Sequence, residues 1–485
     1  MIAALRRTAT SPAAVLFVLA LVSYAYFYQA GGWNQNTRFA MVRATVESGT
    51  VKIDGYESAT GDKSERDGHY YSDKAPGASW LGTPAYAAAR AFTSEEPRGM
   101  QADSFAYVVT VWSVAIPAAA AVAALYGLLG ALGLGAGARA AGALAYAFGT
   151  LAFPFATLYY GHQLTAALVV IGLYALVSAR RGGGGSGPSR GALVAAGSVF
   201  GFAIAVEYPT ALAVIPCLVY AAAFVRPLSR LGWVALGLAG PGLAVAAYHA
   251  IAFGGPLTLP YEYSTQPHRH AGVFMGLGVP SGEALWGILG SPYRGLFFSA
   301  PWLVLALPGT AMLWRRGFRG EAALFAVVPV LFVWMNASLV DWEGGWTVGP
   351  RYLIPAIPFL AVGAAGLGLS RAGVRVRRAG AVLAAILVAV SIGLMLVATS
   401  VKPEVPVQHT RPFGDFLFPR FFAGELADNP QSIESRVSPE GGPRYAWNLG
   451  QIIGLPGLAS LAPLLAVWAA GGALLWRAVK ARARD

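Results

Sequence analysis

Residues 371–400 read Arg-Ala-Gly-Val-Arg-Val-Arg-Arg-Ala-Gly-Ala-Val-Leu-Ala-Ala-Ile-Leu-Val-Ala-Val-Ser-Ile-Gly-Leu-Met-Leu-Val-Ala-Thr-Ser, a basic cluster followed by 22 uncharged residues. An apolar run of about 20 residues is long enough to cross the hydrocarbon core of a bilayer as a helix. The arginines at its start belong on the cytoplasmic side by the positive-inside rule. The stretch therefore predicts a membrane-spanning helix that runs from the cytoplasm to the outer face.

The same alternation of basic clusters and apolar runs recurs along the chain. Of its 485 residues, 56% are hydrophobic and 12% are charged, a composition unlike that of a soluble domain. Keeping every basic cluster in the cytoplasm places both chain ends inside, because Arg6 and Arg7 precede the first span and Arg484 follows the last. The predicted spans are 12–30, 104–130, 138–157, 163–179, 191–207, 209–225, 233–253, 297–314, 322–339, 351–369, 379–400 and 452–476.

This arrangement of the chain across the membrane predicts a single all-α polytopic membrane domain of about 12 transmembrane helices over residues 1–485. Three long segments lie outside the cell: 31–103, 254–296 and 401–451. Within the first of them, residues 36–48 have the spacing of a short helix, with Phe39, Val42 and Val46 on one face.

The acidic residues are distributed very unevenly in this arrangement. Of 23 Asp and Glu residues, only Glu321 and Asp485 fall on the cytoplasmic side. Any chemistry that needs a carboxylate must therefore take place at the outer face. The net charge of +12 belongs to the cytoplasmic flanks of the spans, so it does not indicate binding to nucleic acid.

Two stretches of the first outer segment and one late stretch carry motifs. They are Met41-Val-Arg-Ala-Thr-Val-Glu-Ser-Gly-Thr50, His69-Tyr-Tyr-Ser-Asp-Lys-Ala-Pro-Gly77 and Gly349-Pro-Arg-Tyr-Leu-Ile-Pro-Ala-Ile-Pro358. Together they resemble the GT-C membrane glycosyltransferases, in particular the protein O-mannosyltransferases and the lipid A aminoarabinose transferases. The order of outer loop, helix bundle and Arg-Tyr motif covers most of the chain.

The resemblance implies a GT-C-like bundle in a bacterial inner membrane, with a catalytic first loop on the outer side. Such an enzyme takes a hexose or pentose from a polyprenyl-phosphate carrier and transfers it to a lipid, glycan or protein hydroxyl. Lys74 matches the family lysine that contacts the carrier phosphate, and Tyr71 the tyrosine before it. Arg351 and Arg294, at outer ends of spans, are further candidates to bind the phosphate, since positive charge stabilises a departing phosphate.

The chain departs from the family at the catalytic base. Those relatives carry an Asp just after the first span, whereas this chain reads Asn34-Gln35-Asn36, and an amide cannot accept a proton from a hydroxyl. The candidates to replace it are Asp73, beside Lys74, then Asp54 and Asp62, and Glu207. A carboxylate as close to the membrane as Glu207 needs a partner or a function.

Other outer residues are candidates to bind substrate. They are Tyr71, His162, Asp341, Trp342, Glu343 and Trp346. Aromatic faces stack on sugar rings and carboxylates bind hydroxyls, although Trp also anchors helices at the membrane surface. Asp62, Asp67 and Asp73 carry the oxygen ligands that Mg²⁺ or Mn²⁺ prefers, but their spacing matches no metal motif, and no metal ligand is assigned.

Two other functions stay open from the sequence. A bundle of twelve spans also suits a transporter or flippase for lipid-linked glycans, although the predicted mid-membrane regions are almost free of the charged groups that such proteins use. Loss of the usual Asp also fits a degenerate GT-C-fold protein that binds lipid carriers without catalysis. The sequence identifies neither the sugar nor the acceptor.

Overall fold

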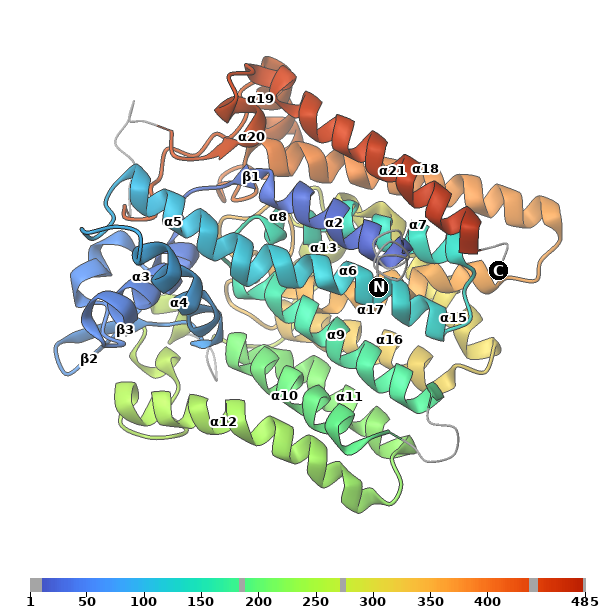
Figure 1. The fold of residues 1–485 in the computed structure, drawn as a ribbon, viewed down its shortest axis with the longest axis horizontal. Helices are drawn as coiled ribbons and strands as arrows, with labels where there is room; N and C mark the ends of the chain where they lie inside the picture. The colour runs from blue at the N-terminus through green and yellow to red at the C-terminus, as the bar shows by residue number, and fades with distance from the viewer. Residues whose placement is uncertain (1–10, 183–187, 271–275, 436–443, 483–485) are drawn as a thin grey trace.

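A computed structural model describes residues 11–182, 188–270, 276–435 and 444–482 of the chain. Four of the residues predicted to be cytoplasmic lie outside these ranges: Arg6, Arg7, Arg484 and Asp485. Long helices run side by side, and the short helices and strands of the first outer segment gather at one end of them (Figure 1). The start of α2 (Pro12–Ala25) and the end of α21 (Ala462–Arg482) lie toward the other end.

Within the described residues, seven helical segments are long and apolar enough to cross a membrane. They are α5 (Met100–Thr110) continuing into α6 (Ile116–Ala131), α9 (Gly161–Gly182), α12 (Leu231–Phe253), α16 (Arg319–Ala337), the segment Arg351–Leu369 with α17 (Ile357–Ala365), α18 (Val374–Val401) and α21 (Ala462–Arg482). The chain is a multi-pass α-helical membrane protein, as the sequence predicts, and α18 contains the uncharged run 379–400.

The predicted number of twelve spans is not confirmed. Five predicted spans are shorter or interrupted helices: α2 (Pro12–Ala25), α10 (Arg190–Val206), α11 (Ala211–Phe224), α7 (Ala136–Phe148) with α8 (Ala152–Ala156), and α14 (Leu296–Ser299) with α15 (Ala306–Arg315). A turn at Gly149 separates α7 from α8, and Pro301 lies between α14 and α15. Proline has no N–H for a helical hydrogen bond. A hydropathy average taken along the chain does not detect either interruption, so each pair of helices was predicted as one span.

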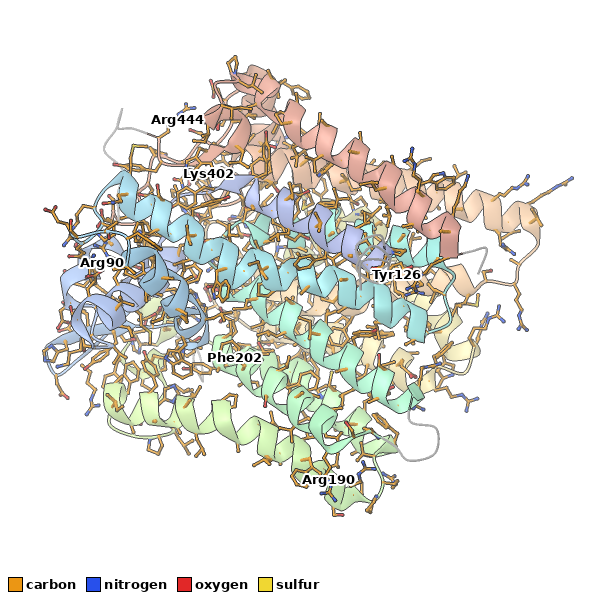
Figure 2. All side chains as sticks on the ribbon, in the orientation of Figure 1. Arg90, Tyr126, Arg190, Phe202, Lys402 and Arg444 are labelled. Carbon is orange, nitrogen blue, oxygen red and sulfur yellow. The ribbon has the colours of Figure 1, made fainter. Side chains whose placement is uncertain are left out.

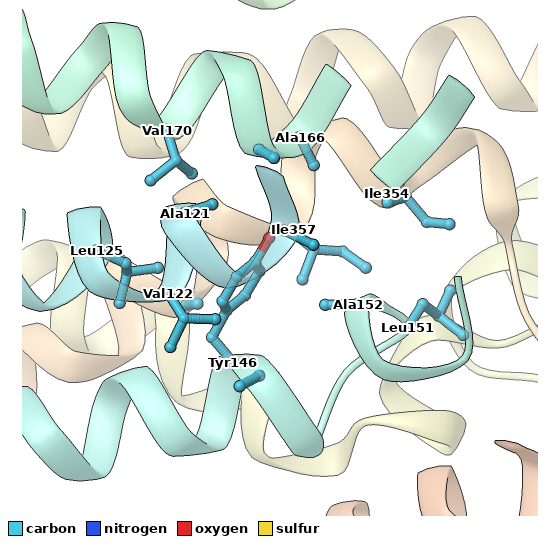
Figure 3. Close-up of a cluster of buried hydrophobic side chains, with 14 of the residues drawn as sticks. Ala121, Val122, Leu125, Tyr146, Leu151, Ala152, Ala166, Val170, Ile354 and Ile357 are labelled. Atoms are coloured by element: carbon cyan, nitrogen blue, oxygen red, sulfur yellow. The ribbon is translucent and has the colours of Figure 1, made fainter. Parts of the chain in front are cut away.

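The core of the bundle lies where α6, α7, α9 and α17 meet. Tyr146 of α7 projects among Val122 and Leu125 of α6 and Ile357 of α17 (Figure 3). Its hydroxyl oxygen accepts a hydrogen bond from Gln163 Nε2 at 3.1 Å. This bond matters because a buried hydroxyl without a partner costs free energy.

Glycines bring α10 and α12 close together. A Cβ atom on Gly237 of α12 would lie 2.2 Å from the carbonyl oxygen of Val194, whereas one on Gly240 would meet open space. We expect Gly237→Ala to lower the free energy of unfolding by about 1–3 kcal/mol because the helices must separate. Gly240→Ala, on the same helix, should be neutral or slightly stabilising. Thermal unfolding of the two variants in detergent tests this, and equal melting temperatures would contradict it.

The first outer segment begins with α3 (Trp33–Ser48), which starts three residues before the predicted helix and ends at Gly49. Phe39 and Val42 are buried and Val46 packs against the same cluster, so the predicted apolar face is confirmed. The remaining short elements are β1 (Phe27–Tyr28), which falls in the predicted span 12–30, and β2 (Lys63–Arg66), β3 (His69–Ser72), α4 (Gly77–Arg90), α13 (Gly282–Leu289), α19 (Phe418–Ala423), β4 (Trp447–Asn448) and α20 (Leu449–Ile452).

The pairing of β1 with β4 joins the third outer segment to the end of the first helix. Arg90 and Arg444 of the outer segments lie at one end of the molecule, and Arg190 at the start of α10 lies at the other (Figure 2). The polar outer segments therefore cover one end of the bundle, and the candidate site residues lie beneath them.

Candidate active site

The site is organised by the β2–β3 hairpin. Its two-residue turn is Asp67-Gly68, and both residues have positive φ, 53° and 75°, as the tight turn of a twisted hairpin requires. The register pairs Lys63 with Ser72 at the open end. The next residue on each side is therefore an aspartate, Asp62 before the hairpin and Asp73 after it.

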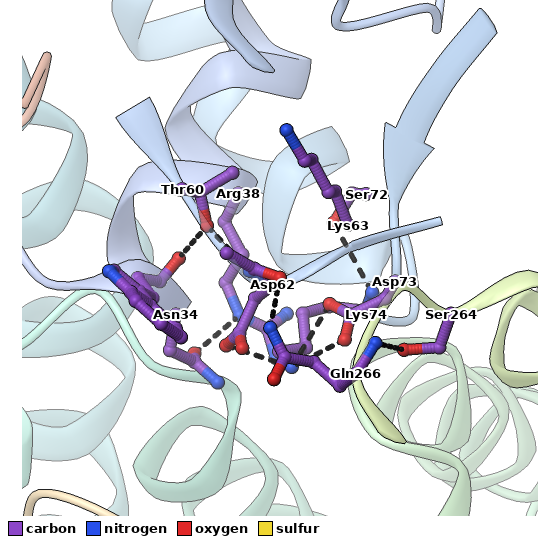
Figure 4. A network of polar contacts seen from close by, with 12 residues as sticks. Asn34, Arg38, Thr60, Asp62, Lys63, Ser72, Asp73, Lys74, Ser264 and Gln266 are labelled. Atoms are coloured by element: carbon purple, nitrogen blue, oxygen red, sulfur yellow. Dashed lines mark hydrogen bonds and ion pairs between the residues drawn. The ribbon is translucent and has the colours of Figure 1, made fainter. Parts of the chain in front are cut away.

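Lys74 bridges these two carboxylates. Its Nζ lies 3.0 Å from Asp62 Oδ2 and 3.0 Å from Asp73 Oδ1, as the contacts in Figure 4 show. Asp73 is fully buried, Lys74 nearly so, and the Asp62 side chain is 17% exposed. The hairpin register thus brings together a buried lysine and two carboxylates, three of the residues predicted from the sequence.

The three charges perturb one another. Burial raises the pKa of Asp62, but the Lys74 ammonium outweighs this effect, so the pKa ends below its usual value. Burial, together with repulsion from Asp62, raises the pKa of Asp73 despite the adjacent ammonium. Burial lowers the pKa of Lys74, but the two carboxylates raise it overall. Two neighbouring carboxyl groups with opposite shifts are a common feature of active sites.

The shift at Asp73 predicts how stability depends on pH. A carboxyl group whose pKa is higher in the folded than in the unfolded protein makes stability fall as pH rises through that pKa. We expect Asp73→Asn to lose this dependence, so that it is more stable than the wild type at about pH 8 and equally stable near pH 4.

Asp54→Asn is the matched control for Asp73→Asn. Burial raises the pKa of Asp54, but bonds from the Tyr70 N–H and His69 lower it overall. The stability it contributes is therefore present above the unfolded pKa and is lost as pH falls, so this variant should be less stable than the wild type at neutral pH. Melting temperatures measured across the pH range distinguish the two, and the same sign for both variants would contradict the assignment.

A second buried ion pair lies next to the first. Arg38 of α3 is fully buried, and its Nη2 donates to Glu207 Oε1 at 2.5 Å. Its Nε donates to Asn34 Oδ1 at 3.1 Å and its Nη1 to the Ala75 carbonyl, one residue after Lys74. Glu207, predicted as a possible base, therefore has a cationic partner, and the side-chain oxygen of Asn34 orients that cation.

Two hydrogen bonds attach the second outer segment to the hairpin, and this segment contributes a further cation, Arg269. Thr265 N–H donates to the Lys63 carbonyl, and Gln266 Nε2 donates to the Gly61 carbonyl at 2.5 Å. Arg269 follows three residues later, close enough for its charge to act on those of Asp62, Asp73 and Lys74.

Arg351 adds a third cation and connects the site to the third outer segment. Its Nη1 donates to the Tyr160 hydroxyl at 3.4 Å, and its charge acts on Asp62. Tyr160 in turn donates to Glu404 Oε1 at 2.5 Å, and Gln35 Nε2 donates to Glu404 Oε2 at 3.1 Å. Burial raises the pKa of Glu404. Nothing in the local sequence indicated Glu404, because its contacts come from distant parts of the chain.

Of the predicted substrate-binding residues, two face this cluster. His162 Nδ1 lies 3.6 Å from Glu207 Oε1. Asp341 Oδ2 accepts a hydrogen bond from the Tyr352 hydroxyl at 3.0 Å and lies 3.7 Å from His268.

The remaining predicted residues have other surroundings. Asp54 is exposed and bound to His69, and Tyr71 packs on Phe253. The Arg294 guanidinium donates to the carbonyls of Tyr293, Glu343 and Gly345, so it has a local structural role. Trp342 packs against Gly287. The ring of Trp346 lies 5.1 Å from Lys402 Nζ, and Trp346 is 45% exposed.

The predicted option of a divalent cation finds no ligand cluster in the described parts of the chain. No group of three His, Cys, Asp or Glu side chains there is arranged to hold a metal ion. Asp67 lies at the hairpin turn, at the far end of the strands from Asp62 and Asp73. The three aspartates considered from the sequence therefore do not converge.

The fold and the site define a multi-pass membrane protein with a buried, charged cluster at one end of its helix bundle. Its fold is similar to that of the oligosaccharyltransferase AglB of Archaeoglobus fulgidus, solved in complex with an inhibitory peptide and a dolichol-phosphate. The TM-score is 0.50 at 13% sequence identity, over 88% of this chain and 60% of AglB. This chain is therefore considerably shorter than AglB.

ArnT of Cupriavidus metallidurans is also similar. Its apo structure matches with a TM-score of 0.47 and 19% identity over 96% of this chain and 75% of ArnT. Its complex with undecaprenyl phosphate matches with a TM-score of 0.46 and 18% identity over 97% and 77%. No family model and no curated protein sequence matches this chain.

Proposed function

We propose that this protein is a glycosyltransferase that takes a sugar from a polyprenyl-phosphate carrier and transfers it to a hydroxyl at the outer face of the membrane. The observation that carries the proposal is a group of three cations at the open end of the hairpin. Lys74, Arg269 and Arg351 all lie close enough for their charges to act on Asp62. A phosphodiester, the linkage that joins a sugar to a polyprenyl phosphate, carries a negative charge that these cations can bind.

The position of the cluster suits a lipid carrier. It lies beneath the outer segments at the end of the bundle, so the polyprenyl tail can remain in the bilayer while the phosphate sits at the level of the headgroups. AglB, which has a similar fold, has been solved in complex with a dolichol-phosphate, a carrier of the same class. We place this end on the outer side and both termini in the cytoplasm, in agreement with the distribution of basic residues.

The chemistry follows from how charge changes during transfer. A phosphodiester with one negative charge becomes a departing phosphate monoester with two. Cations already fixed around the phosphate bind the second state more strongly than the first, and this difference lowers the barrier. We assign this role to Lys74, Arg269 and Arg351. Asp341 and Tyr352 lie at the side of the cluster and are candidates to bind sugar hydroxyls.

The test is release of the carrier by protein reconstituted in proteoliposomes. The substrates are undecaprenyl-phosphate-linked hexoses and pentoses, with a bacterial cell-envelope extract as the acceptor. We expect undecaprenyl phosphate to be released from one of these donors. Movement of the intact donor across the bilayer without release would favour a flippase, and binding without either would favour a non-catalytic carrier-binding protein.

A further inference from the structure

One buried nitrogen of the site has no partner. His162 lies at the start of α9 and is 7% exposed, and its Nε2 has no hydrogen-bond partner among the residues that the structure describes. Buried polar atoms in folded proteins are nearly always hydrogen-bonded. A free nitrogen beside a substrate site therefore indicates a group that the substrate brings.

The other side of the ring faces a carboxylate at a distance slightly too long for a hydrogen bond. Glu207 Oε1 lies 3.6 Å from Nδ1 and is itself fixed by Arg38 at 2.5 Å. The rings of Tyr160 and Tyr352 pack edge-on against the imidazole, with centroids 5.9 Å and 5.7 Å away. A carboxylate at Nδ1 favours the tautomer with its proton there, which leaves the Nε2 lone pair available.

His162 belongs to the same site as the phosphate-binding cations. The side chains whose charges act on the ring are Arg38, Lys74, Arg269 and Arg351. Asp62 and Asp73, the carboxylates that the sequence suggested as bases, are both held by Lys74. Unlike these two carboxylates, the imidazole has a proton-accepting atom, Nε2, that is bound to no cation among the described residues.

We propose that His162 is the general base of transfer and that Glu207 is the residue that positions it. The inference rests on the proposed function. Nε2 takes the proton of the acceptor hydroxyl as its oxygen bonds to the anomeric carbon of the sugar. The bond from that carbon to the phosphate oxygen breaks, and the polyprenyl phosphate leaves with the electron pair. The proton then passes from His162 to water. This step supplies the proton acceptor that Asn34-Gln35-Asn36 cannot provide.

His162→Gln is expected to lower the rate of release of undecaprenyl phosphate about 10²- to 10⁴-fold, the usual contribution of a general base. Binding of undecaprenyl phosphate itself should stay as in the wild type, which also shows that the variant is folded. His69→Gln is the matched control, because His69 lies in the exposed hairpin region with Asp54 and should leave the rate unchanged. His162→Asn serves as a second variant if the glutamine variant does not fold.

Glu207→Gln tests the positioning role, since it keeps an oxygen for Arg38 but removes the charge. We expect kcat to fall with KM for the donor unchanged. The acid limb of the pH–rate profile should move to lower pH, because the imidazolium loses its anionic neighbour while Arg38, Lys74, Arg269 and Arg351 remain. A purely structural role for Glu207 would leave the position of that limb unchanged.

The assignment of His162 as the base and the proposed transferase function can be disproved separately. A rate for His162→Gln within about threefold of the wild type, against the expected loss, would overturn the assignment of the base and leave the transferase intact. A wild type that releases undecaprenyl phosphate from none of the donors would overturn the proposed function itself.

Discussion

Lys74→Ala should lower sugar transfer about 10³-fold and greatly weaken binding of undecaprenyl phosphate. The loss follows from electrostatics, because a buried ammonium stabilises the charge that develops on the leaving phosphate in surroundings that water screens poorly. The side chain is 6% exposed and lies between Asp62 and Asp73. Rates of carrier release and binding of undecaprenyl phosphate measure the two effects.

Removal of Lys74 also leaves two buried carboxylates without their partner, so the variant needs controls. Lys74→Gln combined with Asp73→Asn removes one unpaired charge and should restore folding but not transfer. Lys63→Ala, at the start of β2 with Glu57 as partner, is the matched lysine outside the cluster and should retain activity. Full activity of Lys74→Ala would refute the assignment of Lys74.

Glu207→Ala should reduce the free energy of unfolding by about 3–5 kcal/mol. Arg38 is fully buried, and without Glu207 its guanidinium would keep only the Asn34 side-chain oxygen and the Ala75 carbonyl as acceptors. Removing one member of a buried ion pair is costly because the remaining charge cannot reach water. Thermal and chemical unfolding in detergent measure the loss.

Two further variants show whether the ion pair causes this loss. Arg38→Met combined with Glu207→Leu removes both charges and should recover most of the stability. Asp67→Asn removes the charged partner of Arg66 in a pair whose carboxylate is 79% exposed and keeps a side chain that tolerates the positive φ of the turn, so it should cost less than about 1 kcal/mol. If Glu207→Ala cost no more than Asp67→Asn, the Arg38–Glu207 pair would not contribute to stability as the structure implies.

The sequence predicted the membrane bundle because charge and hydropathy act locally. Arg371–Arg378 and the run after it identify α18 without reference to any other part of the chain. The helix boundaries were not predicted, because a hydropathy average does not register the turn at Gly149 or the single Pro301 inside long apolar runs. This is why the fold class could be predicted and the number of spans could not.

The site could be predicted only where sequence neighbours form it. Asp73 and Lys74 are adjacent, and the Asp67-Gly68 turn, recognisable in the sequence, is sufficient to pair Asp62 with Asp73 once a hairpin is assumed. The contact between Arg38 and Glu207 joins residues 169 positions apart, and a single sequence holds no signal for it.

Charge and position along the chain also did not distinguish Arg294 from Arg351. Both arginines stand near outer ends of predicted spans, and both are plausible phosphate ligands from the sequence. In the structure each nitrogen of the Arg294 guanidinium donates to a backbone carbonyl, whereas the Nε of Arg351 has no hydrogen-bond partner among the described residues. The difference arises from the loop 341–346, whose conformation the sequence did not predict.

The most direct test of the carrier-dependent function is native mass spectrometry of the purified wild-type protein with its copurifying lipids. It needs no knowledge of the sugar or of the acceptor. We predict bound polyprenyl phosphate or its glycosylated form, which is displaced by added undecaprenyl phosphate and absent from Lys74→Ala. Ordinary phospholipids alone in both proteins, with no binding of added undecaprenyl phosphate, would contradict a carrier-binding site at Lys74.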